Sequence, residues 1–298
     1  MQGEALPLRG QLTRNASLAE YNSWRVGGCA DILYIPADLD DLAIFLQTLP
    51  ADIPIFWLGL GSNVLIRDGG LEGVVIVTQG ALSNMSTVDC LVRAEAGVSC
   101  AQLARYTARQ ALTGLEFMAG IPGTVGGALA MNAGCYGGET WQCVQQVETI
   151  NRLGERRLRQ AAEFEVGYRH VSRYPDEWFV AGHFKLAHGE KARSLENIRV
   201  LLEKRNASQP TGLPNCGSVF RNPPGQYAAK LIELSGLKGK IIGGASVSEK
   251  HANFIINEGN ASASDIEQLI KHIGEKVMLE HGVSLIPEVC FVGRELAR

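Results

Sequence analysis

The sequence predicts an α+β protein of two lobes, and three observations lead to this. Amphipathic helix patterns occur in separated blocks, short β-rich runs lie between them, and one polar segment interrupts both patterns. That segment, 203–217, is rich in Pro, Asn, Ser and Gly, which favours a connection between lobes. The length of 298 residues allows one to three domains, so we expect a boundary near residue 205.

Capping residues and hydrophobic spacing predict four helices. Asp38 precedes one amphipathic segment and Ser99 precedes a second. Residues 194–205 carry a stripe of apolar side chains at helical spacing. A capping-box pattern begins at Ser264, and Gly282 follows the last apolar position of that helix. We expect each helix to pack its apolar face against a core.

Short runs rich in β-branched and aromatic residues predict the strands. They alternate with the helical blocks along the chain, so we expect each lobe to contain both kinds of element. The runs are 31–36, 53–59, 73–78, 91–97, 143–150, 177–186 and 252–257.

The charge balance and the cysteines exclude several classes of protein. Lys and Arg number 28 against 31 Asp and Glu, a net charge of −3, so we expect no nucleic-acid partner. The seven cysteines are scattered, odd in number and never in C-x-x-C spacing, which argues against a disulfide framework and against a metal site. Reduced thiols favour a cytoplasmic location.

Neither candidate membrane segment is convincing. The N-terminal residues lack the apolar core of a signal peptide. The run 117–138 has no charged residue and is long enough to cross a bilayer, but its 22 positions include seven glycines, a proline and an asparagine. We therefore expect no membrane insertion.

Two glycine-rich clusters are the strongest candidates for a ligand site. The first reads GLGSN from Gly59 to Asn63, and the second reads GTVGG from Gly123 to Gly127. Glycine permits φ > 0 and close approach of another molecule, so each cluster can present several backbone N–H groups to one ligand. Together they suit the oxygens of a diphosphate. The alternative is that both clusters are tight turns between packed strands.

The familiar phosphate motifs do not fit this chain. The nearest match to a P-loop, 212–218, lacks the lysine that reaches the outer phosphates. The dinucleotide fingerprint G-x-G-x-x-G fails because Val64 occupies the third glycine position. A diphosphate site here belongs to another fold.

Six segments along the chain carry a family resemblance. They are YNSWRVGGCADILYIP (21–36), LGLGSNVLIRDGGLEGVVI (58–76), AGIPGTVGGALAMNAGCYGGE (119–139), VGYRHVSRY (166–174), the segment that begins PNCGSVF (214–257) and LIPEVCFVG (285–293). In this order they resemble the UDP-N-acetylenolpyruvoylglucosamine reductase (MurB) family of peptidoglycan synthesis. The glycine segments alone occur across many flavoproteins, whereas the ordered set is specific to this family.

The resemblance implies a fold and a domain division. It implies an FAD-binding lobe of the vanillyl-alcohol oxidase or PCMH type, built from two α/β subdomains, followed by an α+β substrate-binding lobe. The short interval after GYR resembles the compact branch of the family, which lacks an extra substrate-covering loop and its tyrosine. The implied division is an FAD-binding domain at 20–190 with subdomains 20–80 and 81–190, a connecting helix at 191–205 and a substrate-binding domain at 206–298.

The resemblance also implies the cofactors. FAD is bound without a covalent link, so His170, Cys29 and Cys135 have no attachment role, and NADPH is the co-substrate. The residues implied in FAD binding are Gly59, Leu60, Gly61, Ser62, Asn63, Val64, Gly123, Thr124, Val125, Gly126, Gly127, Ala128, Asn132, Ala133 and Gly134.

The implied reaction reduces the enolpyruvyl ether of UDP-N-acetylglucosamine enolpyruvate to a lactyl ether. Hydride reaches C3 of the substrate, and C2 becomes an enolate that must be held and protonated. Arg169 is implied as the cation that holds it and Ser218 as the acid that protonates it. Glu288 is implied to assist, which requires it to be protonated or bridged to Arg169. The plainer alternatives are a surface ion pair, a turn cap and a strand-edge carboxylate.

Other positions have weaker support. Tyr168 and Asn222 are implied substrate contacts. A diphosphate-binding lysine of longer relatives aligns near Ser208, so Arg205 or Arg221 is expected to substitute for it. Cys216, where the family has a small alanine, is expected to pack as a small apolar residue without a role in catalysis.

Two other functions remain open at this point. Another FAD-dependent oxidase or dehydrogenase of the same superfamily would keep the glycine clusters but lack the GYR, GS-x-F and PEV motifs, all of which occur here. A non-catalytic flavin-binding protein would hold a flavin that NADPH does not bleach. We expect only small-molecule partners, the substrate and NADPH, and a monomer.

Overall fold

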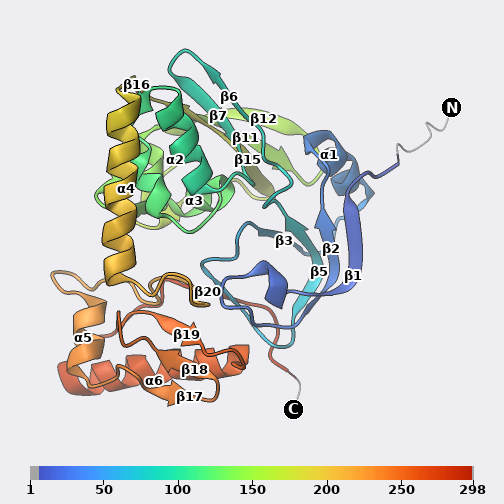
Figure 1. Ribbon diagram of the computed structural model, residues 1–298. Helices are drawn as coiled ribbons and strands as arrows, with labels where there is room; N and C mark the ends of the chain where they lie inside the picture. Colours follow the sequence, from blue (N-terminus) through green and yellow to red (C-terminus); the bar gives the residue numbers. More distant parts are fainter. Residues whose placement is uncertain (1–6, 297–298) are drawn as a thin grey trace. The chain divides into compact units, whose positions relative to one another are not determined.

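The computed structural model (Figure 1) describes residues 7–296 and divides the chain into two compact units. The first unit comprises the N-terminal residues to Arg14, Ile32–Leu60 and Gly73–Glu203. The second comprises Asn15–Asp31, Gly61–Glu72 and the chain from Lys204 onward. Each is described by itself below.

A five-stranded antiparallel sheet is the framework of the first unit. Its order is β12 (Arg156–Gln160), β11 (Val144–Asn151), β15 (Glu177–Lys185), β7 (Leu91–Glu95) and β6 (Met85–Val88). Helices α2 (Cys100–Arg109) and α3 (Val125–Met131) pack on it (Figure 1), and their apolar side chains share one core with those of β7 and β15. The long helix α4 (Lys191–Ser208) adds Ile198 to the same core.

A second core of the first unit lies around helix α1 (Leu39–Thr48). Asp38 caps this helix as predicted, because its side chain accepts hydrogen bonds from the N–H groups of Asp40 and Asp41. Leu42, Phe45 and Leu46 face the core. A four-stranded sheet has the order β1 (Gln11–Ser17), β2 (Cys29–Ile35), β5 (Leu71–Val77) and β3 (Ile55–Leu58), with β3 and β5 parallel.

The second unit is built on helix α6 (Ala263–His281). Its buried face packs against a three-stranded antiparallel sheet of β17 (Ile241–Ile242), β18 (Ala245–Val247) and β19 (Ile255–Asn257), and against α5 (Ala228–Leu234). Strand β20 (Cys290–Val292) pairs in parallel with β4 (Val64–Ile66). The fully buried Trp24 joins this core, and its indole Nε1 donates to the Ile255 carbonyl at 2.8 Å.

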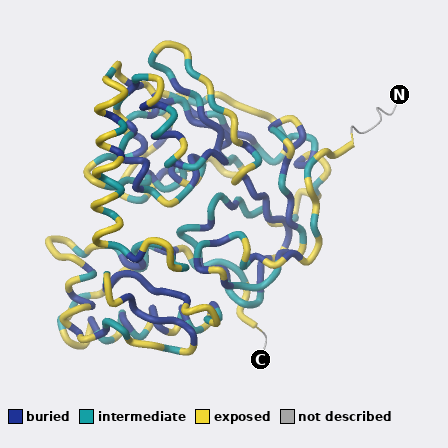
Figure 2. Tube along the Cα trace, in the orientation of Figure 1, coloured by how far each residue is buried: buried dark blue, intermediate teal, exposed yellow. Residues whose placement is uncertain are grey.

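Short elements complete the chain. They are η1 (Ala19–Tyr21), β8 (Leu112–Thr113), η2 (Glu116–Gly120), β9 (Gly134–Cys135), β10 (Gly138–Glu139), η3 (Thr140–Gln142), η4 (Ala161–Glu163), β13 (Val166–Gly167), β14 (His170–Val171) and β16 (Ala187–His188). In Figure 2 the inner strands β7 and β15 of the five-stranded sheet are largely buried, whereas its edge strands β12 and β6 and the helix α4 are largely exposed or half-buried.

The structure corrects two details of the helix predictions. Helix α6 is capped by Ser262, whose hydroxyl accepts from the Asp265 N–H, and not by Ser264. The Ser264 N–H instead donates to the carboxylate of Asp68 at 2.9 Å. Helix α4 continues to Ser208, so the predicted polar connection at 203–217 begins in helix. The caps at Ser99 and Gly282 are confirmed.

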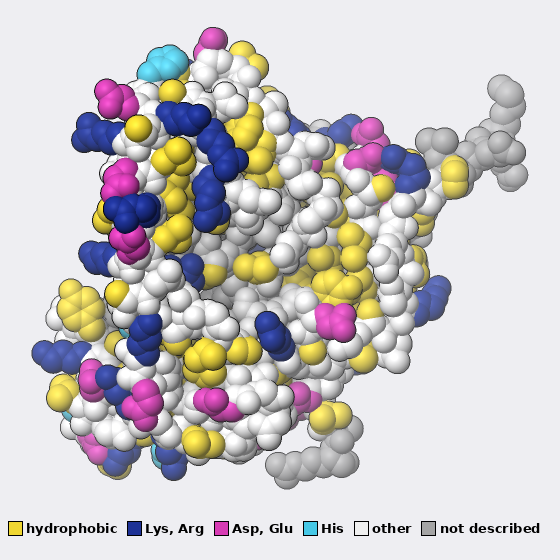
Figure 3. Space-filling model, in the orientation of Figure 1, with side chains coloured by type: hydrophobic (Ala, Val, Ile, Leu, Met, Phe, Trp, Pro, Cys, Tyr) yellow, Lys and Arg dark blue, Asp and Glu magenta, His cyan; other side chains and the backbone are white. Residues whose placement is uncertain are grey.

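Helix α4 carries charged side chains of both signs. Acidic and basic side chains alternate along α4 (Figure 3), where Arg199 pairs with Glu196 and Glu203. Among residues 7–296, no helix is both long and apolar enough to cross a bilayer. In the same residues no group of three His, Cys, Asp or Glu side chains is placed to hold a metal ion.

A half-buried ion pair in the five-stranded sheet gives a pH-dependent stability. The Arg93 guanidinium donates to both carboxylate oxygens of Glu148, at 2.6 and 2.8 Å, and His183 Nε2 lies 2.8 Å from one of them. Burial by itself would raise the pKa of Glu148, but the hydrogen bonds from Arg93 and His183 outweigh it and lower the pKa to about 2.

We therefore expect the folded protein to lose stability as the pH falls from about 4.5 to about 2. The folded pKa of Glu148 is depressed, so its contribution, on the order of 3 kcal/mol, is present above the unfolded pKa and lost below it. Urea unfolding of the wild type and of Glu148→Gln across this range measures it. The exposed Glu20→Gln serves as control. A difference between wild type and Glu148→Gln that does not shrink at low pH would contradict the prediction.

Candidate active site

The uncharged run 117–138 contains most of η2, the short helix α3, and β9 with part of its partner β10, all in the first unit. Helix α3 begins directly after Gly123 and Thr124. The Val125 N–H donates to the Val98 carbonyl at 2.8 Å, and the Gly126 N–H donates to the Ala96 carbonyl at 2.9 Å. Two of the amides that we expected to face a ligand are therefore held within the fold.

Gly59 and Thr124 bring the two glycine clusters into contact. Thr124 is 2% exposed, and its Oγ1 has no hydrogen-bond partner among the described residues. This hydroxyl lies so close to Gly59 that a Cβ atom there would clash with it. Among the described residues, the N–H of Leu60 has no acceptor either. An unpaired buried hydroxyl and an unpaired amide beside bare backbone suit a ligand with acceptor oxygens.

A pocket of the first unit opens on the same backbone. Gly59, Gly126 and Gly127 form part of its wall, and the rings of Trp57 and Trp178 stack at 5.3 Å between centroids. The pocket is therefore partly polar backbone and partly aromatic surface. Its other lining residues are Leu58, Thr78, Ala96, Ala130, Arg173 and Phe179.

Arg169 lies at the tip of a tight hairpin. Strands β13 and β14 are joined by Tyr168 and Arg169 alone, and Arg169 has φ 55°, in the left-handed region that costs a non-glycine residue free energy. Its Nη2 donates to the Gly134 carbonyl at 2.9 Å. The guanidinium carbon lies 5.0 Å from the ring centroid of Tyr168, which is 54% exposed.

Asn132 connects this hairpin to the end of α3. It is 1% exposed and left-handed, with φ 43°. Its Nδ2 donates to Glu139 Oε2 at 2.9 Å and to the Gly167 carbonyl at 3.2 Å, and its Oδ1 accepts from the Trp141 N–H. The resemblance implies Asn132 in FAD binding, but these side-chain contacts are all to the protein. No sequence pattern predicts that Asn132 connects the hairpin to the end of α3.

In the second unit, the segments of Ser218 and Glu288 run side by side. The Glu288 N–H donates to the Val219 carbonyl at 2.7 Å, and Phe220 forms an antiparallel bridge with Pro287. Ser218 is half-buried beside this pairing. Two residues predicted to be catalytic are thus brought together, although they are far apart in the sequence.

The end of the first glycine cluster lies against the same pairing. Asn63 Nδ2 donates to the Glu288 carbonyl at 3.2 Å, and the Cys216 thiol donates to the Ser62 carbonyl at 2.9 Å. Cys216 is 4% exposed, and burial raises the pKa of its thiol far above the ordinary value. It stays protonated at neutral pH, which agrees with the expected packing role. The second unit therefore joins cofactor and catalytic candidates.

Comparison with known proteins identifies the family. The chain is 59% identical over 287 residues to UDP-N-acetylenolpyruvoylglucosamine reductase of Legionella pneumophila (strain Corby), covering 96% of this chain and 93% of the relative. It is 53% identical to the reductase of Coxiella burnetii (strain Dugway 5J108-111), over 96% of this chain and 97% of the relative. The chain belongs to the UDP-N-acetylenolpyruvoylglucosamine reductase family.

Family models and a solved structure support the assignment. The C-terminal domain model of UDP-N-acetylenolpyruvoylglucosamine reductase matches residues 209–292, and an FAD binding domain model matches residues 30–158. The crystal structure of the reductase (MurB) from Thermus caldophilus superposes with a TM-score of 0.81 at 32% identity, covering 96% of this chain and 99% of that chain. The predicted reductase family, its oxidoreductase class and FAD as its cofactor are confirmed.

A more distant structure supports the fold only. 6-Hydroxy-D-nicotine oxidase from Arthrobacter nicotinovorans has a TM-score of 0.57 at 12% identity, covering 96% of this chain and 90% of that chain. The predicted fold class, an FAD-binding lobe of the PCMH type with an α+β C-terminal lobe, is confirmed together with the mixed helix and strand content.

The remaining candidates of this reductase have specific surroundings. The Asn222 side-chain oxygen accepts from the Ala228 N–H at 3.1 Å and so satisfies the first amide of helix α5. Arg221 has a buried Nε without a partner among the described residues. The Ser208 hydroxyl donates to the Lys204 carbonyl at the end of α4.

The close contact at Gly59 gives a stability prediction. Gly59→Ala should lower the free energy of unfolding by about 1–3 kcal/mol, because the new methyl group overlaps Thr124 Oγ1. Adding Thr124→Ala removes that hydroxyl and should recover part of the loss. Urea unfolding of the wild type, both single variants and the double variant gives the coupling between the two positions. Additive effects in the double variant would contradict the prediction.

Proposed function

We propose that this chain is the NADPH-dependent reductase that converts UDP-N-acetylglucosamine enolpyruvate to UDP-N-acetylmuramate for peptidoglycan synthesis. The observation that carries the proposal is the pairing of the Ser218 segment with the Glu288 segment beside Asn63, in a chain of this family. An acid and a carboxylate next to a cofactor loop are the groups that protonation of an enolate requires.

We assign FAD binding to the two glycine clusters. The unpartnered Thr124 hydroxyl, the Leu60 amide and the aromatic pocket suit a dinucleotide with a planar ring and a diphosphate. The assigned residues are Gly59–Val64, Gly123–Ala128 and Asn132–Gly134 as predicted, with Asn132 acting through its contacts to the protein. When bound, FAD supplies the hydride for C3 of the substrate.

The catalytic roles follow from the chemistry of each side chain. The Ser218 hydroxyl gives its proton to C2 of the substrate. Arg169, whose guanidinium is held by the Gly134 carbonyl, offsets the negative charge on the substrate carboxylate. Glu288 assists when it is protonated or bridged to Arg169, since an unpaired ionised carboxylate would repel the enolate. Tyr168, which is exposed beside Arg169, and Asn222 contact the substrate.

The wider assignments complete the proposal. The FAD-binding domain at 20–190, the helix from 191 and the substrate-binding domain to 298 remain the proposed division. The protein acts as a monomer in the cytoplasm on small molecules alone. Its cysteines support this location, since none of those described forms a disulfide and Cys100 and Cys216 are buried.

Anaerobic mixing tests the function. The purified protein should carry FAD, NADPH should bleach it, and UDP-N-acetylglucosamine enolpyruvate should restore its absorbance. Flavin that NADPH does not bleach would indicate a non-catalytic flavin protein. Bleaching without recovery on adding the substrate would indicate another oxidoreductase. Either result would contradict the proposal.

A further inference from the structure

The pocket of the first unit has one charged residue in its lining, and it is a cation. Arg173 shares this lining with Gly59, Gly126 and Gly127, and no acidic side chain contributes to it. Within residues 7–296, the exposed Arg173 guanidinium has neither an ion pair nor a hydrogen bond. An unpaired guanidinium beside the glycine backbone of a pocket favours binding of an anionic ligand.

The chain on both sides of Arg173 is fixed. The Ser172 N–H donates to the Glu165 carbonyl at 2.9 Å, and the Ser172 hydroxyl accepts from the Glu165 N–H at 2.8 Å. The Tyr174 ring lies under the Arg159 guanidinium, whose carbon is 3.6 Å from the ring centroid. The backbone of Arg173 is therefore held in place, while its own side chain is left for another partner.

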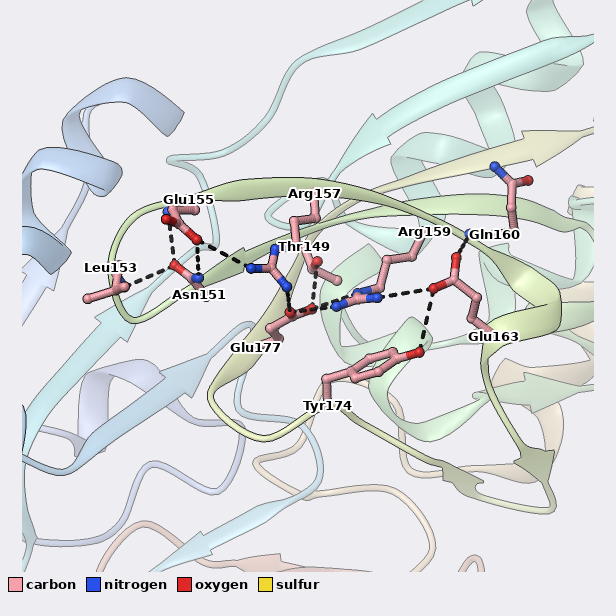
Figure 4. A network of polar contacts seen from close by, with 10 residues as sticks. All are labelled: Thr149, Asn151, Leu153, Glu155, Arg157, Arg159, Gln160, Glu163, Tyr174 and Glu177. Atoms are coloured by element: carbon pink, nitrogen blue, oxygen red, sulfur yellow. Dashed lines mark hydrogen bonds and ion pairs between the residues drawn. The ribbon is translucent and has the colours of Figure 1, made fainter.

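Figure 4 shows how firmly the Tyr174 side is held. Glu177 binds Arg159 through two hydrogen bonds of 2.7 Å, and Glu163 binds the same guanidinium at 3.0 Å. The Tyr174 hydroxyl is directed to Glu163 at 3.5 Å. These carboxylates are occupied by Arg159 and Tyr174, so the network fixes the loop without neutralising Arg173.

Two uncharged donors beside the pocket are also without acceptors. Trp57 lines it, and its buried Nε1 has no partner among the described residues. Thr124 Oγ1, buried between Gly59 and Gly127, is unpaired as well. One cation and two neutral donors, with no carboxylate in the lining, suit phosphate oxygens attached to an apolar group that the aromatic walls can contact.

We propose that Arg173 binds the diphosphate of FAD in this pocket. The inference rests on the proposed function and extends it, since the cofactor's charge is then met by a guanidinium as well as by backbone and hydroxyl dipoles. Arg173 is a binding residue and takes no part in the chemistry. The other source of the same ligand chemistry is NADPH, and the test separates the two.

Dissociation of FAD from the holoenzyme tests the proposal. Diluting the holoenzyme and following the fluorescence of released FAD gives the Kd at several salt concentrations. Arg173→Gln should raise this Kd about tenfold or more and flatten its dependence on salt, because a charged hydrogen bond is lost. The Kd of Arg173→Lys for FAD should lie between that of Arg173→Gln and that of the wild type. Arg193→Gln, an exposed arginine of α4 without a partner among the described residues, should match the wild type.

Each of the other possible results would overturn either the role of Arg173 or the proposed function. A Kd and a salt dependence within twofold of the wild type in Arg173→Gln would overturn the proposal. So would an equal weakening in Arg193→Gln, or a changed KM for NADPH with an unchanged Kd for FAD. A wild-type protein that carries no FAD would instead overturn the proposed function. Circular dichroism of Arg173→Gln checks that the variant is folded.

Discussion

Ser218→Ala is expected to leave reduction of the flavin by NADPH unchanged and to slow its reoxidation by the enolpyruvyl substrate by ~10²–10⁴-fold. Alanine cannot supply the proton for C2, whereas hydride entry to the flavin does not involve this residue. The two half-reactions can be followed separately in an anaerobic stopped-flow instrument by the absorbance of the flavin.

The matched control for this variant is Ser284→Ala. Ser284 is exposed and precedes Glu288 on the segment that pairs with the Ser218 segment. Its reoxidation rate should equal that of the wild type. If Ser218→Ala recovers its absorbance as fast as Ser284→Ala, Ser218 is not the acid, and the pairing with the Glu288 segment has only a structural purpose.

Asn132→Ala is expected to lower the free energy of unfolding by about 3 kcal/mol. The substitution leaves the Trp141 N–H and the Gly167 carbonyl without their partner and removes a hydrogen bond to the Glu139 carboxylate. It also places alanine in a left-handed conformation that asparagine tolerates better. Urea unfolding with constant m-values measures the change.

Asn84→Ala is the control for this prediction. Asn84 is exposed, and its hydrogen bond to Glu95 uses the backbone N–H, so the substitution should change stability by about 0.5 kcal/mol or less. A similar small effect at Asn132 would show that its three contacts do not stabilise the fold. In that case the direct role in FAD binding implied by the resemblance would regain support.

Local signals predicted the four longer helices and most of the longer strands but missed α3, α5 and the short strands, and these failures have a physical cause. The caps at Asp38 and Ser99 are correct because each cap bonds to residues within its own first turn. Ser262 and Ser264 both begin a pattern with an acidic residue three positions later. Ser262 is the cap because the Ser264 N–H already donates to Asp68, a residue that is distant in the sequence.

The sequence predicted the family more completely than it predicted the candidate site. The motifs named candidate residues, but the pairing of residues 219 and 288 depends on tertiary folding, and a three-residue strand such as β20 carries no periodic signal. Asn132 and Arg173 also lay inside recognised motifs. Their roles depend on which neighbouring side chains are already satisfied, and composition does not contain that information.

The pairing of β20 with β4 limits how early in its synthesis this protein can complete its fold. Residues 64–66 are translated more than 220 positions before their partner residues 290–292. The second unit draws on both regions, so its earlier segments stay incompletely covered until residues 290–292 have been made. A premature stop codon before residue 290 would release a polypeptide in which the loop at Asn63 never gains its final backbone contact.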